Sequence, residues 1–218
     1  MAVLSWFENW FGTRSSSQHE VYDISDLAAI REENVNLVYW KRPVDPDMEW
    51  FVQQICRDGF PALNVPVDRH EVRSVVAHHF AKVGVESFGK TKLEKDVVHI
   101  TQQFMDVVNS DRLRLIMKVV TDDACRKFHT DAYDLRLLCT YAGRGTEWIA
   151  DAWTNRRKLI DGDNNDIVRD WTKVQRLEPF EVAILKGEPA GRPTGGIVHR
   201  SPPIEQSGEK RFLLRLDY

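Results

Sequence analysis

The most informative segment of the chain reads His129-Thr-Asp-Ala-Tyr-Asp-Leu-Arg-Leu-Leu-Cys-Thr-Tyr-Ala-Gly-Arg-Gly-Thr-Glu-Trp148. It opens with a histidine and an aspartate two positions apart, continues as an apolar run, and ends in a glycine-rich turn. In an extended chain, residues i and i+2 point to the same side, so the imidazole of His129 and the carboxylate of Asp131 could share one metal ion. The apolar run predicts a strand from Leu135 to Tyr141.

A second candidate ligand, His199, lies much later in the chain, within Gly195-Gly-Ile-Val-His-Arg-Ser-Pro-Pro203. Two imidazoles and one carboxylate leave three neighbouring positions open on an octahedral ion, as non-haem Fe(II) requires to bind a keto acid and oxygen together. No thiolate belongs to the set, which disfavours structural zinc. The alternative to a metal site is a structural role for all three residues: His129 caps a turn, Asp131 accepts a hydrogen bond from a loop amide, and His199 packs on a strand.

The residues around these ligands resemble those of the 2-oxoglutarate- and Fe(II)-dependent oxygenases, especially the prolyl-hydroxylase-like branch. The resemblance implies a double-stranded β-helix, also called a jelly-roll or cupin-like fold. It also implies that His129, Asp131 and His199 hold Fe(II), that 2-oxoglutarate is the co-substrate, and that a C–H bond of a further substrate is hydroxylated.

The same resemblance assigns the keto acid to a basic residue on the last strand, in Gly208-Glu-Lys-Arg-Phe-Leu-Leu-Arg-Leu-Asp217. Arg211 is the first choice, because a planar guanidinium can hold a carboxylate through two parallel hydrogen bonds. Arg215 lies on the same strand face and is the alternative. Tyr141 and Arg136 are further candidates for lining the cofactor pocket, with packing in the core or support of the ligands as their other reading.

A narrower resemblance is to the bacterial domain-of-unknown-function family 1826. It rests on the segment from Phe128 to Trp148, on Leu185-Lys-Gly-Glu188 and on Val198-His-Arg-Ser-Pro-Pro203. It covers most of the chain beyond about Val35 and implies a β-helix with a metal site, without assigning a substrate.

The two halves of the chain differ in their apolar periodicity. Apolar residues recur at helical spacing within 48–55, 72–83 and 93–108, which predicts three amphipathic helices, and 37–40 reads as an isolated strand. Beyond residue 110 the pattern changes to short β runs at 113–120, 135–141, 146–149, 182–185, 196–199 and 212–216, with a long polar insertion at 155–173.

These patterns predict an α+β protein. Residues 1–20 are expected to form a tail with an aromatic cluster, residues 21–110 a helical support segment, and residues 111–218 the β-helix core, the last two making one structural unit. The N-terminal helices are expected to buttress the C-terminal double-stranded β-helix.

The composition narrows the function classes. The 218 residues include 30 basic and 33 acidic residues, for a net charge of −3, so no global field favours nucleic acid or an anionic membrane. Three cysteines without a C-x-x-C pair, and a start without signal-peptide character, lead us to expect a cytoplasmic protein.

Two functions remain open from the sequence. The first is an Fe(II)- and 2-oxoglutarate-dependent dioxygenase acting on an unidentified small molecule or peptide. The second is a non-catalytic, cupin-like protein that senses or buffers zinc or iron, because imidazole and carboxylate suit both ions.

Overall fold

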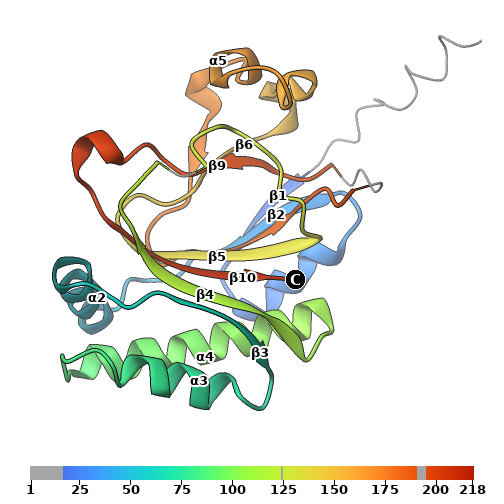
Figure 1. The fold of residues 1–218 in the computed structure, drawn as a ribbon. Helices are drawn as coiled ribbons and strands as arrows, with labels where there is room; N and C mark the ends of the chain where they lie inside the picture. The colour runs from blue at the N-terminus through green and yellow to red at the C-terminus, as the bar shows by residue number, and fades with distance from the viewer. Residues whose placement is uncertain (1–16, 124, 191–194) are drawn as a thin grey trace, which may run out of the picture.

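The computed structural model describes residues 17–123, 125–190 and 195–218. It is a mixed α+β fold in which helices cover one face of a large sheet and a small sheet lies over the other face (Figure 1). The aromatic cluster expected in the N-terminal tail lies outside the described residues.

The large sheet has seven strands in the order β1-β2-β8-β5-β10-β4-β3. All its neighbours are antiparallel except β1 and β2, which are parallel. The strands are β1 (Ser17–Val21), β2 (Val35–Trp40), β3 (Leu63–Asp68), β4 (Arg112–Val120), β5 (Leu135–Ala142), β8 (Val182–Lys186) and β10 (Arg211–Asp217).

The three predicted amphipathic helices are confirmed as α2 (Pro46–Asp58), α3 (Val72–Phe80) and α4 (Phe88–Val108). The side chain of Asp45 caps α2, and proline occupies its first turn, where a missing N–H costs nothing. The apolar faces of the helices pack on the large sheet and form the main core with it. None of the helices in the described ranges is long and apolar enough to cross a membrane.

The first half of the chain also supplies strands that its helical periodicity does not predict. The stretch expected as an isolated strand is β2, which pairs with β8 inside the large sheet. β1 and β3 form the two edges of that sheet. Pro66 lies within β3, which an edge strand tolerates because one side of its backbone has no partner strand.

The second half alternates between the two sheets. The six predicted β runs are present as β4, β5, β6 (Glu147–Ile149), β8, β9 (Val198–Arg200) and β10, and a two-residue strand, β7 (Gln175–Arg176), was not expected. β7, β6 and β9 make the small sheet, in that order. The chain therefore passes from one sheet to the other and back several times after β4.

The polar insertion is more ordered than its composition suggests. It contains the short helix α5 (Asn164–Ile167), and its Val168 forms a β-bridge with Thr154, the residue just before the insertion. Because of α5, this half of the chain is not purely β. A small apolar cluster packs the insertion against the small sheet. The buried members are Phe128, Ile149, Ile167, Val168 and Val198.

Candidate metal centre

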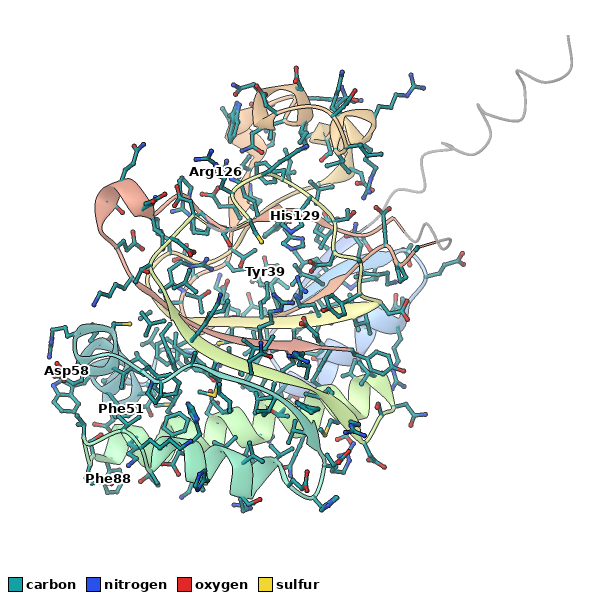
Figure 2. All side chains as sticks on the ribbon, in the orientation of Figure 1. Tyr39, Phe51, Asp58, Phe88, Arg126 and His129 are labelled. Atoms are coloured by element: carbon teal, nitrogen blue, oxygen red, sulfur yellow. The ribbon has the colours of Figure 1, made fainter. Side chains whose placement is uncertain are left out.

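A β-bridge between the backbones of His129 and His199 brings the two candidate histidine ligands together. The N–H of each residue donates to the carbonyl of the other at 3.0 Å, so His129 and His199 lie directly opposite each other in an antiparallel pair. Their rings consequently stand side by side, with centroids 4.7 Å apart. Figure 2 shows His129 between the large sheet and the segment that carries α5.

Asp131 completes the cluster, as the sequence spacing predicts. One ligand atom from each of His129, Asp131 and His199 can be chosen so that all three lie within 4.8 Å of one another, and Asp131 and His199 are buried. The Nε2 atoms of His129 and His199 lie 3.9 and 3.4 Å from carboxylate oxygens of Asp131. A single ion could therefore contact all three side chains.

The tautomers of both histidines suit a metal. Nδ1 of His129 lies 2.8 Å from the Lys127 carbonyl, and Nδ1 of His199 lies 3.1 Å from the Ile197 carbonyl. A carbonyl only accepts, so each Nδ1 carries the proton and each Nε2 presents a lone pair to the centre. Outer hydrogen bonds of this kind orient the imidazole ligands of metal sites.

The two carboxylate oxygens of Asp131 have different surroundings. Oδ1 accepts from Nη1 of Arg136, whereas Oδ2 is buried with no hydrogen-bond partner among the described residues. A buried carboxylate oxygen without a partner carries a large desolvation cost, which a bound cation would offset. The donor set and this unpartnered oxygen fit a divalent metal.

Arg136 links the candidate ligand to the last strand. Its Nε donates to Asp217 Oδ1 at 2.6 Å, and Asp217 also accepts from Arg215 at 2.6 to 2.9 Å. Arg136 and Asp217 are both buried. Arg136 thus lies beside the triad of His129, Asp131 and His199, and its hydrogen bond fixes Oδ1 of Asp131.

A tight turn positions the loop that carries Asp131. The N–H of Glu188 donates to the Asp131 carbonyl at 2.7 Å, and the N–H of Gly187 donates to the Asp134 carbonyl at 3.0 Å. A Cβ at position 187 would come within 2.0 Å of the Tyr133 carbonyl oxygen, so only glycine permits this approach.

Burial keeps His199 neutral. It lowers the pKa of His199 to about 4, with the neighbouring His129 acting in the same direction and the Asp131 carboxylate opposing it. A neutral imidazole at ordinary pH is the form that binds a metal ion.

Arg211 is the most deeply buried of the three arginines considered for the keto-acid pocket, Arg136, Arg211 and Arg215. It is 1% exposed, and Nη2 donates to Thr140 Oγ1 at 3.2 Å, while Nε has no partner in the described ranges. Burial lowers the pKa of Arg211 to about 10. Alternation along β10 places Arg211 on the same face of the sheet as Arg215 and Asp217, away from the helices.

Tyr141 lies on the other face of the large sheet. It packs in the main core against Phe180 and Phe212, and its hydroxyl donates to Asp96 of α4 at 2.7 Å. The structure therefore brings Arg136 to the triad but not Tyr141. Sequence reasoning missed Thr140 and Asp217, whose roles depend on register across strands.

The chain belongs to the family described as "Protein of unknown function (DUF1826)", whose model matches residues 22–217. This finding confirms the narrower resemblance. No curated protein matches the chain.

Solved structures that resemble the chain include oxygenases at low identity. A dioxygenase for auxin oxidation from rice has a TM-score of 0.49 and 10% identity, covering 93% of this chain and 82% of its own. The Fe(II)/α-ketoglutarate-dependent dioxygenase TqaL has a TM-score of 0.47 and 11% identity, covering 89% and 86%. A prolyl-4-hydroxylase from Pseudomonas putida has a TM-score of 0.41 and 10% identity, covering 89% and 96%.

Proposed function

We propose that this protein is a non-haem Fe(II)- and 2-oxoglutarate-dependent dioxygenase that hydroxylates an as yet unidentified substrate. One observation carries the proposal. Two imidazoles and one carboxylate converge with their Nδ1 atoms and Asp131 Oδ1 already bonded, so that both Nε2 atoms and Asp131 Oδ2 remain for a metal. This facial donor set is typical of non-haem iron sites.

The order of the strands supports a double-stranded β-helix. After β4, the chain visits the small-sheet side at His129, the large sheet at β5, and the small sheet at β6 and β7. It then returns through β8, β9 and β10 to the large, small and large sheets. Regular alternation between two facing antiparallel sheets is the pattern of a jelly roll.

Arg211 and Thr140 supply an anion site for the keto acid on the same face of the sheet. The buried guanidinium of Arg211 has an N–H without a partner among the described residues, and the Thr140 hydroxyl lies beside it. Together they would bind the distal carboxylate of 2-oxoglutarate, and burial would strengthen that interaction by excluding water. Arg215 is the weaker candidate, because its guanidinium is already paired with Asp217.

The three ligands and the groups that orient them have separate roles. His129, Asp131 and His199 would hold Fe(II), which supplies the oxygen chemistry when bound. Arg136 fixes one oxygen of Asp131, and the Lys127 and Ile197 carbonyls fix the two imidazoles. These contacts would keep the donor atoms in place before the metal arrives.

The decisive experiment is uncoupled decarboxylation of 2-oxoglutarate by the purified protein with added Fe(II), measured as succinate formed. We expect turnover that the His199→Ala variant loses and that Lys95→Gln, an exposed substitution on α4, retains. Stoichiometric metal binding without any succinate would instead favour the non-catalytic zinc- or iron-binding protein.

A further inference from the structure

A cavity opens on the same side of the large sheet as the triad, and none of the triad residues lines it. Its volume is about 420 Å³. It lies over β3, β4 and β10, with the loop after Asp131 forming one wall. The polar side chains lining it are Asn64, Arg114, Lys118, Tyr133, Arg215 and Asp217.

The register of the sheet gathers three cations around one apolar residue. Arg114 and Lys118 flank Ile116 on the same face of β4, and Arg215 of β10 pairs directly opposite Ile116. Ile116 and the exposed Ala62 provide the apolar part of the lining near these charges. The cavity therefore has a cationic rim and a partly apolar floor.

The single carboxylate of the cavity does not neutralise this charge. Asp217 is already bonded to both Arg136 and Arg215. Arg114 Nε donates to the neutral amide oxygen of Asn64 at 2.7 Å, and neither Arg114 nor Lys118 forms a salt bridge within residues 17–123, 125–190 and 195–218. Two cations are thus available to an incoming anion.

The cavity adjoins the candidate metal centre through two shared contacts. Asp217 lines the cavity and bonds to Arg136, which in turn bonds to Asp131. The ring of Tyr133 lies against both Arg136 and Arg215, at 4.8 and 5.8 Å from their guanidinium carbons. The cavity wall at Asp217 and Tyr133 is therefore linked to the triad through Arg136.

We propose that this cavity binds an organic anion through Arg114 and Lys118, with the apolar part of the molecule on Ile116 and Ala62. That this anion is also the substrate of the oxygenase rests on the proposed function. The recognised group is a carboxylate or a phosphate monoester, because both offer several acceptor oxygens to guanidinium and ammonium donors. Arg211, buried and bonded to Thr140, stays assigned to the keto acid.

Calorimetric titration of the metal-free protein tests the cavity with three probes: hexanoate, hexyl phosphate and neutral hexanol. We expect saturable binding of one or both anions, weakened by added salt, and none of hexanol. The anion that binds tells carboxylate recognition from phosphate recognition. Arg114→Gln and Lys118→Gln should each weaken binding roughly tenfold, since each removes one charged hydrogen-bond donor. Lys95→Gln, which removes an exposed charge from α4, should bind as the unmodified protein does.

Both substituted side chains are exposed, so unfolding temperature and circular dichroism should match those of the unmodified protein. Affinity that is unchanged in both variants, or absence of saturable binding, would overturn the proposal. The titration needs neither iron nor turnover. Anion binding without decarboxylation would therefore refute only the proposed function, and decarboxylation without anion binding would refute only this cavity.

Discussion

At the level of single residues, the unequal surroundings of the two Asp131 oxygens determine how the carboxylate can bind a metal. Arg136 occupies Oδ1, so Oδ2 is the oxygen left for the ion. Binding through one oxygen leaves more of the coordination sphere for other ligands than binding through both.

Substitution of Asp131 gives the first prediction. The unmodified protein should bind about one divalent ion per chain, and Asp131→Asn should bind none at the same metal concentration, because the charge that neutralises the ion is lost. Metal content after dialysis measures the effect. His78→Ala, on the exposed side of α3, is the matched control, and an equal metal content in Asp131→Asn would contradict the assigned site.

Substitution of Arg211 gives a prediction with two opposite effects. Arg211→Met removes a buried, poorly partnered charge, so the protein without 2-oxoglutarate should become equally or more stable to heat. The same variant should lose roughly 2–5 kcal/mol of 2-oxoglutarate binding, as expected when one member of a buried charged pair is truncated.

The comparison variant for Arg211 is Arg215→Met. It breaks an ion pair with Asp217, so we expect lower stability and a smaller effect on the keto acid. The opposite pattern in 2-oxoglutarate titrations would assign the keto acid to Arg215.

At the level of elements, the sequence predicts those parts whose apolar pattern is strong. The three helices could be located because each buries one regular face, and the six β runs because they are short apolar stretches separated by turn residues. β1 could not, because Val21 is its single apolar residue and the segment becomes a strand only by pairing with β2. β3 was not expected although Leu63, Val65 and Val67 alternate along it, because a proline such as Pro66 argues against a strand interior.

The candidate site was predictable to the same limited extent. The spacing of His129 and Asp131 and the later His199 identify the triad, but the partners Asp217 and Thr140 are visible only once the register of β5 and β10 is known. Strand alternation explains Tyr141: it lies an odd number of positions from Arg136 on β5 and so faces the helices.

The turn at Gly187 provides the prediction at this scale. Gly187→Ala should displace the loop of Asp131 and Tyr133, because the added Cβ would meet backbone atoms of that loop. We expect weaker metal binding, seen in a Co(II) titration followed by absorbance, together with a lower Tm. Gly84→Ala is the control, since a Cβ there meets nothing within 4 Å, and equal titrations of the two variants would argue against this role of the turn.

At the level of the whole molecule, we expect the contact between α3 and the segment that leads into β3 to make stability depend on pH. His79 of α3 is buried against Phe60, with Nε2 2.6 Å from the Pro61 carbonyl. Burial lowers the pKa of His79 below its ordinary value of 6.5. Below that pH the unfolded chain takes up a proton more readily than the folded one, so stability should fall as the solution becomes acidic.

This dependence can be measured by urea unfolding between about pH 5 and pH 7. His79→Gln keeps a donor near the Pro61 carbonyl but cannot titrate, so its free energy of unfolding should change less over this range. The remaining histidines contribute equally to both proteins. Parallel pH profiles would show that His79 does not contribute.

The proline in β3, one of the two edge strands of the large sheet, has a consequence for how the molecule behaves at high concentration. An exposed sheet edge is a template on which a second chain can add a strand, the first step toward aggregation. Pro66 removes one backbone donor from β3, and Asn64 and Asp68 place polar groups along the same strand. The cavity lined by Arg114 and Lys118 thus borders a strand whose sequence disfavours edge-to-edge pairing with a second chain.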